Sequence, residues 1–407
     1  MQIAAYAQGF LNKGFFMKEI FLGFVFDEKK CEQIYKDSKT GLQIAGNQYQ
    51  MGFLEGLNRK LDIISVLPVG TFPKGNKRIN YKYDFAMTKQ GKIEYISFTN
   101  LYFIKDLTQM NSLIRALKQR IDKYEFVTIY VYSLYMPFLS SLQKLKKKYT
   151  NLSICLIVPD LPGKYGILRP TFSLGGMRDR IEARKKIKLA QIADSYVLLT
   201  ETMTEVLPKR PYTVIEGFLP QQKFDYSNKR EAKTVLYTGS LNAAYGIDKL
   251  LDAFAQIADP DFRLWICGAG GIQSTVEEYA KKDNRITYFG FLPKDKVAEL
   301  QTRCDILINP RSPHGEYTKY SFPSKTMEYL LSGSKVLMYR LPGVPEEYYD
   351  YIYTIDGSTS EDIAAAIIKA CEDKSFQARR TEQIEWIKTQ KNNQTQMKKL
   401  TELLNEV

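Results

Sequence analysis

The stretch SFPSKTMEYLLSGSKVL, Ser321 to Leu337, predicts a loop, then a short helix, then a strand. We expect Ser321 to cap the helix and Pro323 to lie in its first turn, where a missing N–H costs nothing. Gly333 is the expected end of the helix, because glycine readily adopts the left-handed cap conformation. Three apolar residues at helical spacing form the predicted buried face: Met327, Leu330 and Leu331.

The polar face of this predicted helix indicates what the stretch binds. Lys325 lies in the first turn, where free backbone N–H groups and the helix dipole attract an anion. Glu328 lies one turn further on, where its carboxylate can accept hydrogen bonds from sugar hydroxyls. The pair therefore predicts a site for a phosphate joined to a sugar. The alternative is that Lys325 and Glu328 form an ordinary exposed i, i+3 ion pair.

The length of 407 residues is too great for one ordinary core and indicates two domains. The five Cys are an odd number and lie far apart, which argues against a disulfide framework and favours a cytoplasmic location. His314 is the only His in the sequence. With one His and no clustered Cys, we expect no metal site.

The formal net charge of +13 favours an anionic partner. The densest basic clusters, at residues 145–149 and 177–188, are predicted to be amphipathic helices. They carry no nucleic-acid-binding signature, so an anionic membrane surface is preferred to nucleic acid as the partner. We expect a cytoplasmic protein that associates peripherally with the inner face of the membrane. No apolar run reaches the length of a membrane span, and residues 1–16 are treated as an extension without a function.

Strands and helices alternate along the chain, which predicts parallel sheets with helices on both faces. The first domain is expected over residues 17–219, a polar linker over 220–233 and a second doubly wound domain over 234–375. Residues 376–407 are predicted helices that cross back to the first domain. Ligands bind outside the carboxyl ends of parallel strands, so we expect the site in the cleft between the two domains.

Five motifs of the second domain follow one another as they do in retaining glycosyltransferases of the GT-B fold. They are VLYTGSLNAAYGIDKLLDAF, FRLWICGAGG, RITYFGFLPKDKVAEL, CDILINPRS and FPSKTMEYLLSGSKVL. The chain over about residues 234–356 resembles the large family 4, glycosyl transferases group 1, in a sub-branch with the pattern FPSK-x-x-EY. The resemblance implies an α/β GT-B fold, with two Rossmann-like doubly wound domains facing across a cleft.

The resemblance also implies roles on the donor side. Glu328 matches the family Glu that holds the ribose hydroxyls, and Arg311 and Lys325 would hold the diphosphate. Tyr320 stands where the family has an earlier Glu, so the loop SPHGEYTKYS would supply the contacts to the donor sugar. The expected donor-binding residues are Gly239, Ser240, Phe291, Leu292, Arg311, Tyr320, Ser321, Phe322, Pro323, Ser324, Lys325 and Glu328.

Candidates for the acceptor side are implied in the first domain. Gly46, Asn47 and Gln48 are expected in a loop that lines the acceptor, just before a helix that starts near residue 49. Asp160 is a catalytic candidate near the reacting carbon, with a turn-forming Asp as its alternative. His314 is a second catalytic candidate, with an ordinary loop residue as its alternative.

The function implied is transfer of a hexose-type sugar from a UDP- or GDP-sugar to a hydroxyl group, with retention and without a metal or another cofactor. The acceptor would be a saccharide, a lipid-linked saccharide or a glycoprotein in the synthesis of a cell-surface polysaccharide or glycoconjugate. Two alternatives stay open: a nucleotide-sugar epimerase on the same fold, and a non-catalytic partner subunit. Ser240 and Tyr245 stand where the family often has basic residues, which keeps the partner subunit in consideration.

Overall fold

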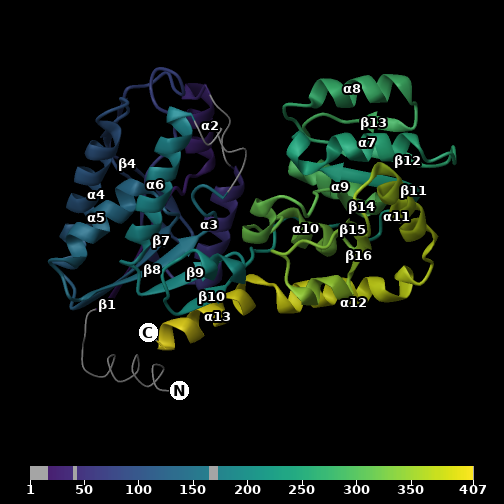
Figure 1. Ribbon diagram of the computed structural model, residues 1–407. Helices are drawn as coiled ribbons and strands as arrows, with labels where there is room; N and C mark the ends of the chain where they lie inside the picture. Colours follow the sequence, from purple (N-terminus) through teal and green to yellow (C-terminus); the bar gives the residue numbers. More distant parts are fainter. Residues whose placement is uncertain (1–16, 40–43, 165–172, 407) are drawn as a thin grey trace. The chain divides into compact units, whose positions relative to one another are not determined.

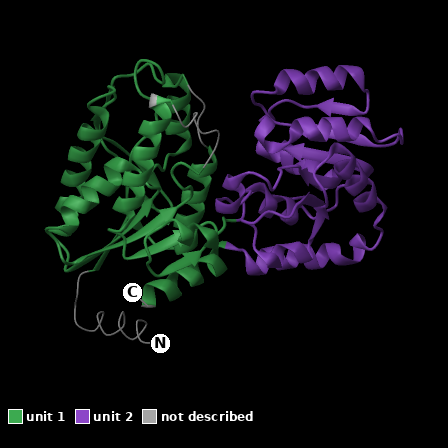
Figure 2. Ribbon diagram, viewed as in Figure 1, with its two compact units in different colours: residues 1–218, 393–407 green, residues 219–392 purple. Residues whose placement is uncertain are grey.

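The computed structural model describes residues 17–39, 44–164 and 173–406 and divides into two compact units (Figure 1; Figure 2). Unit 1 comprises residues 1–218 and 393–407, and unit 2 comprises residues 219–392. The extension expected over residues 1–16 lies outside the described residues. Among the described residues, no helix is long and apolar enough to cross a membrane.

Unit 1 is built on an eight-stranded sheet in the order β10-β9-β8-β7-β1-β2-β5-β4, in which only β4 and β5 pair antiparallel. Its strands are β1 (Met17–Gly23), β2 (Leu61–Ser65), β4 (Asp84–Thr88), β5 (Gly91–Tyr95), β7 (Phe126–Tyr132), β8 (Leu152–Val158), β9 (Ser195–Leu198) and β10 (Tyr212–Val214). Two short strands, β3 (Asn80–Tyr81) and β6 (Phe98–Thr99), form a separate pair. The central strands are almost wholly apolar because helices cover both faces of the sheet.

The helices of unit 1 come from both ends of the chain. They are α2 (Glu28–Asp37), α3 (Ile44–Leu57), α4 (Lys105–Ile121), α5 (Met136–Lys146), α6 (Leu174–Ala190), the 3-10 helix η1 (Glu201–Glu205) and α13 (Asn393–Glu406). The last helix packs on α3, where a Cβ at Gly56 would lie 2.6 Å from Cγ of Met397. Glycine at residue 56 therefore permits this close approach.

Unit 2 is built on a six-stranded, wholly parallel sheet in the order β13-β12-β11-β14-β15-β16. Its strands are β11 (Glu231–Thr238), β12 (Arg263–Cys267), β13 (Ile286–Tyr288), β14 (Cys304–Asn309), β15 (Lys335–Tyr339) and β16 (Ile352–Ile355). Its helices are η2 (Ala243–Tyr245), α7 (Ile247–Ala255), α8 (Gln273–Lys282), α9 (Lys294–Arg303), η3 (Glu316–Tyr320), α10 (Lys325–Ser332), η4 (Glu346–Asp350), α11 (Ser360–Glu372) and α12 (Phe376–Gln390).

The strand order of unit 2 locates a ligand site. The chain winds from β11 outward to β12 and β13, and then returns to place β14, β15 and β16 on the other side of β11. The winding direction therefore reverses between β11 and β14. In open parallel sheets, a ligand crevice forms at such a reversal, outside the carboxyl ends of the strands.

The observed unit boundaries differ from the expected ones at two places. The polar residues 220–233 belong to unit 2, and β11 already begins at Glu231. This segment is held by single side chains rather than by a periodic face: the Tyr226 hydroxyl donates to the Leu331 carbonyl at 2.9 Å. Helix α12 also belongs to unit 2, so only α13 returns to unit 1.

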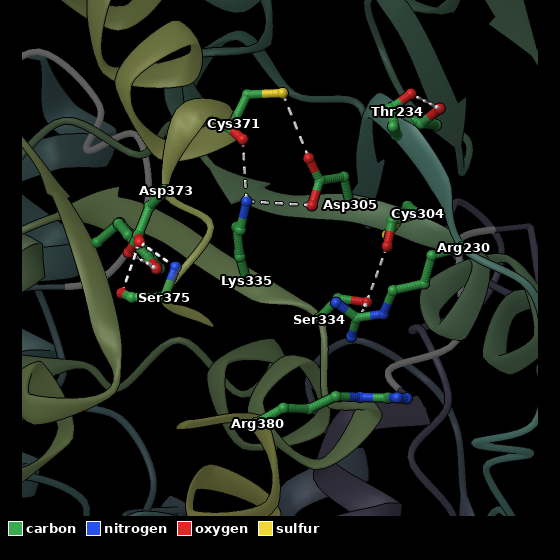
Figure 3. Close-up of polar contacts among 12 residues, drawn as sticks. Arg230, Thr234, Cys304, Asp305, Ser334, Lys335, Cys371, Asp373, Ser375 and Arg380 are labelled. Carbon is green, nitrogen blue, oxygen red and sulfur yellow. Dashed lines mark hydrogen bonds and ion pairs between the residues drawn. The ribbon is translucent and has the colours of Figure 1, made fainter. Parts of the chain in front are cut away.

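A buried polar cluster lies at the amino ends of β14 and β15 (Figure 3). This is the edge of the sheet opposite the carboxyl ends of the strands. The Lys335 ammonium lies 3.3 Å from a carboxylate oxygen of Asp305 and donates to the Cys371 carbonyl at 3.2 Å. Arg230 and Arg380 both donate to the Gly333 carbonyl at the end of α10. Burial, and then the charge of Arg380, lower the pKa of Arg230 to about 10. These contacts hold the end of α10 and the start of β15 in place.

All five Cys are free thiols. Cys155 and Cys304 are buried inside strands, and burial raises the pKa of each thiol to about 12. Both are therefore neutral core residues near pH 7, as the scattered Cys pattern predicts.

Candidate functional site

The loops that follow β11, β12 and β13 pack directly on one another at the carboxyl edge of the unit 2 sheet. The Gly239 N–H donates to the Cys267 carbonyl at 3.0 Å, and the Gly268 N–H donates to the Gly290 carbonyl at 2.8 Å. Gly268 has a φ of +149°, and a Cβ there would collide with the Gly239 carbonyl. Only glycine fits at this position, so the GAGG segment is required by the packing of two loops.

The backbone that leads into Gly239 is anchored by Tyr329 of α10. The Tyr329 hydroxyl donates to the Thr238 carbonyl at 2.9 Å and accepts from the Thr238 N–H at 3.0 Å. Tyr329 is 1% exposed, and burial raises the pKa of its phenol, so it remains a neutral donor. Tyr329 is therefore a core residue, although it lies in the same short helix as the accessible Lys325.

Gln301 of α9 links this anchor to the predicted ribose ligand. Its amide nitrogen donates to Oε1 of Glu328 at 2.7 Å and to Oγ1 of Thr238 at 3.3 Å. Gln301 is fully buried. Gln301 cannot be recognised from the sequence, because one polar residue inside an amphipathic helix carries no distinguishing pattern.

Lys325 and Glu328 form the ion pair that the plainer alternative predicts. The Lys325 ammonium lies 2.9 Å from each carboxylate oxygen of Glu328. The pair is not fully exposed, since 13% of the Glu328 side chain and 41% of the Lys325 side chain are accessible. Burial raises the pKa of the Cys267 thiol, and the nearby Lys325 charge opposes that shift. The charge of Lys325, in the first turn of α10, therefore acts on Cys267 at the end of β12.

The segment before α10 differs from the expectation in two respects, since Pro323 precedes the N-cap residue and does not lie in the first turn of the helix. Ser321 does not cap the helix: α10 begins at Lys325, and Ser324 is its N-cap residue. The Ser321 hydroxyl instead donates to the Tyr317 carbonyl at 2.7 Å and accepts from Arg311 at 2.6 Å. The 3-10 helix η3 ends at Tyr320, so Ser321 is the C-cap of η3 and not the N-cap of α10. Gly333 ends the helix with a φ of +75°, as predicted.

Three of the predicted donor residues lie in the interior of this segment. Tyr320 is 7% exposed and Phe322 is 5% exposed. The Phe322 ring lies 5.2 Å from the ring of Tyr348, and Pro323 is buried as well. Their side chains therefore shape the segment, whereas Ser324 and Lys325 remain accessible.

Arg311 follows β14 and lies at the point where the winding of the sheet reverses. It is 7% exposed, and its guanidinium lies over the ring of Tyr317 at 4.4 Å and that of Tyr245 at 6.0 Å. Within the described ranges, its guanidinium has one polar contact, the hydrogen bond to Ser321; its Nε has no partner, and it forms no ion pair. A buried cation without a carboxylate is costly unless a ligand neutralises it.

The two sides of the reversal point are locked together around Arg311. The Tyr317 hydroxyl donates to the Ala244 carbonyl in η2 at 2.9 Å. Gly246 has a φ of +76°, and a Cβ there would collide with the Pro310 carbonyl. Tyr245 thus serves as an aromatic platform for Arg311.

The remaining candidates of unit 2 lie at the surface. Phe291 is 76% exposed, Leu292 is half-buried, and Ser240 and His314 are exposed. The Tyr237 hydroxyl donates to the Ser240 carbonyl at 2.9 Å and so fixes the course of that loop.

The predicted acceptor residues of unit 1 lie in a helix and not in a loop. Helix α3 begins at Ile44, so Gly46, Asn47 and Gln48 occupy its first turns. The Asn47 side chain does not cap α3: its oxygen accepts from the Phe26 N–H, and its nitrogen donates to the Phe26 carbonyl, both at 3.0 Å. The helix starts early because Asn47 and its neighbours are fixed by the loop after β1.

Tyr132, at the end of β7, lies near both predicted acceptor sites, the Gly46 segment and Asp160, which are far apart in the sequence. A Cβ at Gly46 would lie 3.3 Å from the Tyr132 hydroxyl. Burial raises the pKa of Tyr132, and the charge of Asp160 adds to that shift. Gly46 and the exposed Asp160 therefore lie around the same phenol, which sequence reasoning did not select.

A family model described as "Glycosyl transferases group 1" matches residues 220–386, which lie within unit 2. A search of curated proteins finds no match. Sucrose-phosphate synthase from Thermosynechococcus elongatus is similar in structure, with a TM-score of 0.61 and 15% identity over 96% of this chain and 99% of that chain.

Two further solved structures are similar. HepE from Anabaena, in complex with UDP and glucose, has a TM-score of 0.59 and 17% identity over 96% of this chain and 100% of that chain. Trehalose-6-phosphate synthase, described for glycosyl transfer with retention, has a TM-score of 0.61 and 10% identity over 95% of this chain and 99% of that chain. The chain therefore has the predicted α/β GT-B fold with two Rossmann-like units. The match over unit 2 supports the glycosyltransferase class.

Proposed function

We propose that the protein is a retaining glycosyltransferase of family 4 that transfers a hexose-type sugar from a UDP- or GDP-sugar to a hydroxyl acceptor. The observation that carries this proposal is Arg311, a buried cation without a carboxylate partner in the described residues, at the winding reversal of a parallel sheet. A diphosphate supplies the missing negative charge, and an Arg binds it in a bidentate manner.

Different residues around Arg311 are proposed to bind the diphosphate, the ribose and the base of the donor. The accessible turn at Ser324 and Lys325 meets the diphosphate, because the N–H groups of a helix start and an ammonium both favour anions. Glu328, held by Gln301, accepts from the ribose hydroxyls. The exposed Phe291 borders the base.

The chemistry proposed is stabilisation of the leaving diphosphate. Negative charge develops on the diphosphate as the bond to the sugar breaks. Arg311 and Lys325 together stabilise this charge more strongly than they stabilise the intact donor. A leaving phosphate oxygen takes the proton of the acceptor hydroxyl on the same face of the sugar, which gives retention. Proteins of similar fold include one described for retention and one bound to UDP and glucose, which agrees with this chemistry.

The acceptor is proposed to bind at the carboxyl edge of the unit 1 sheet, around Gly46, Asp160 and Tyr132. These residues offer a helical backbone with a small side chain, a carboxylate and a neutral phenol, which suit a saccharide hydroxyl. A lipid-linked saccharide in the synthesis of a cell-surface polysaccharide is the acceptor class we favour, in a protein located at the cytoplasmic face of the membrane.

The test is the response of donor binding to Lys325→Ala, measured by calorimetry with UDP, GDP, uridine and guanosine. We expect the affinity for the preferred nucleoside diphosphate to fall about tenfold to a hundredfold, the effect of losing one charged hydrogen bond, while nucleoside affinity stays unchanged. Lys296→Ala is a matched control, because Lys296 and Glu299 form another i, i+3 pair at 3.0 Å on α9. Equal losses for nucleoside and nucleoside diphosphate, or the same loss in Lys296→Ala, would show that Lys325 does not contact phosphate.

A non-catalytic partner subunit is the second candidate. It is favoured by Lys325, whose charge is already engaged by Glu328, and by Ser240 and Tyr245 at positions where relatives often have cations. A panel of nucleotide sugars separates the two candidates. Donor binding with neither donor hydrolysis nor transfer supports the subunit, whereas turnover of one donor supports the enzyme.

A further inference from the structure

Unit 1 exposes a group of large apolar side chains at the starts of two helices. Phe103, just before α4, is 86% exposed, and Leu107 in the first turn of α4 is 58% exposed. Met177 and Ile181, in the first two turns of α6, are 54% and 52% exposed. Burying apolar surface is the main stabilising term in folding, so a cluster left in water calls for a partner.

The two helix starts are neighbours. The Arg178 guanidinium donates to the Tyr102 hydroxyl at 2.6 Å and lies over that ring at 5.6 Å. Asp106, in the first turn of α4, is close enough for the charges of Glu182 and Lys186 in α6 to act on its pKa, which burial raises. We refer to Tyr102, Phe103, Leu107, Met177 and Ile181, with the basic residues of α6, as the α4–α6 surface.

These side chains are not the packing face of either helix. Helix α4 packs through Gln109, Leu113, Leu117 and Ile121, all of which are almost fully buried. Helix α6 turns Gly176 and Ala190 inward. The exposed apolar residues therefore stand on the outer side of elements whose inner side is already satisfied.

Positive charge surrounds the apolar group. Helix α6 carries six Arg or Lys residues and two acidic ones, and Glu182 is already paired with Lys186 at 2.7 Å. Arg184 and Lys188 follow Met177 and Ile181 at spacings of three and four, so they continue the same exposed face. Long basic side chains can lay their apolar stems on a surface while the charged ends reach anions.

We propose that the α4–α6 surface binds an anionic membrane, with Phe103, Leu107, Met177 and Ile181 entering the interface and the α6 cations contacting lipid headgroups. Protruding apolar tips flanked by cations suit a soft, negatively charged surface, which needs no complementary shape. The tips project from two separate helix starts, and each of these starts also presents the positive end of a helix dipole. The projecting apolar tips together with this positive charge therefore favour an anionic lipid surface over a protein partner.

This docking does not depend on glycosyl transfer, but it has a consequence for the proposed acceptor. Helices α4 and α6 begin at the carboxyl edge of the unit 1 sheet, the edge that holds Asp160. A Cβ at Gly163 would lie 3.4 Å from Cβ of Ala183, so the loop after β8 touches α6. If the proposed function holds, the docked protein presents its acceptor residues close to the membrane, where a lipid-linked saccharide resides.

The test is flotation of the full chain with vesicles of phosphatidylcholine alone, or of phosphatidylcholine mixed with phosphatidylglycerol. We expect binding to the anionic vesicles that weakens as salt is added. Two double variants, Phe103→Ser with Met177→Ser and Arg184→Glu with Lys188→Glu, are each expected to lower the partition coefficient at least tenfold.

Matched controls test whether substitution of other exposed apolar or basic residues lowers vesicle binding equally. Phe85→Ser with Met87→Ser removes two apolar residues of edge strand β4 that are 54% and 71% exposed. Lys147→Glu with Lys148→Glu reverses two exposed cations at the end of α5, in the basic cluster at residues 145–149, which the proposal leaves outside the α4–α6 surface. Both control pairs are expected to keep the partition coefficient within about twofold, since a surface substitution away from a site has little effect.

Three results would overturn the proposal: no flotation with anionic vesicles at low salt, equal flotation with both kinds of vesicle, or equal losses in the controls. Binding only to an acidic protein added to the assay would also overturn it. Circular dichroism of the same variants checks that unit 1 remains folded, and their nucleoside-diphosphate affinity checks the donor site of unit 2. Failure of membrane docking therefore leaves the test of the proposed function intact.

Discussion

A single substitution of Arg311 tests whether its buried charge is neutralised by a bound diphosphate. Arg311→Met keeps the apolar stem between Tyr317 and Tyr245 and removes the charge. If an anion neutralises Arg311, the nucleoside-diphosphate affinity should fall about tenfold or more. The free energy of unfolding without ligand should stay the same or rise, because an unpaired buried charge is gone. Calorimetry with UDP and GDP and urea denaturation measure the two effects.

Arg285 is the matched control for Arg311. It is also largely buried, but it binds Asp283 at 2.7 Å and lies over the ring of Phe254 at 5.0 Å. Arg285→Met should therefore lower stability and leave nucleotide affinity unchanged. If Arg311→Met behaves like Arg285→Met, then Arg311 is a structural residue and the main support for the donor site is lost.

At this scale the sequence supplies the charged residues but not their supports. Lys325 and Glu328 are recognisable because a helix start and a one-turn spacing have direct chemical meaning. Gln301 and Tyr329 are not recognisable, because their roles depend on a strand more than sixty positions away in the chain. Side-chain periodicity indicates which face is buried and does not say which buried hydroxyl meets which backbone group.

The elements of unit 2 are held at their amino ends by the cluster in Figure 3. Lys335 joins β15 to Asp305 of β14, with 6% and 14% of the two side chains exposed. Lys335→Met should destabilise the protein by about 3–5 kcal/mol, because it leaves the Asp305 carboxylate buried without its cation. The midpoint of urea denaturation measures this change.

The double variant Lys335→Met with Asp305→Leu removes both charges and serves as the control. It should recover much of the lost stability, since a buried ion pair contributes little net when apolar residues replace it. A double variant that is less stable than Lys335→Met would show that the polar contacts of Asp305, including the 3.3 Å bond from the Cys371 thiol, are the stabilising part.

The sequence predicts helices and strands correctly where apolar residues repeat with a regular period. It does not predict the residues at which the helices begin. The apolar strands of both sheets and the Gly333 helix end follow directly from local chemistry. Ser321 fails as a cap, because η3 and Arg311 claim its hydroxyl before α10 begins. The early start of α3 also escapes prediction, because Asn47 is fixed by the distant loop at Phe26.

On the scale of the whole molecule, the chain leaves unit 1 after residue 218 and returns to it at residue 393. The alternating pattern of strands and helices predicts the two sheets, since each needs helices on both faces. The same pattern cannot tell which sheet a terminal polar helix serves. Helix α12 stays with unit 2 because Gln383 donates to the Leu330 carbonyl at 2.9 Å and the Ser334 carbonyl at 3.1 Å.

Helix α13 should therefore be part of the core of unit 1 even though it is the last element of the chain. Met397, Leu400 and Leu403 are 5%, 1% and 4% exposed, and Gln396 donates to the buried Glu216 carboxylate at 3.0 Å. Leu400→Ala should lower stability by about 2–5 kcal/mol through the cavity it leaves. Hydrogen exchange should then quicken in α3 and β10 of unit 1, while β14 and β15 of unit 2 keep their protection. Glu402→Ala, on the exposed side of the same helix, should change neither unit. Equal loss of protection in both units after Leu400→Ala would mean that α13 stabilises the molecule as one cooperative body and is not specific to the unit on which it packs.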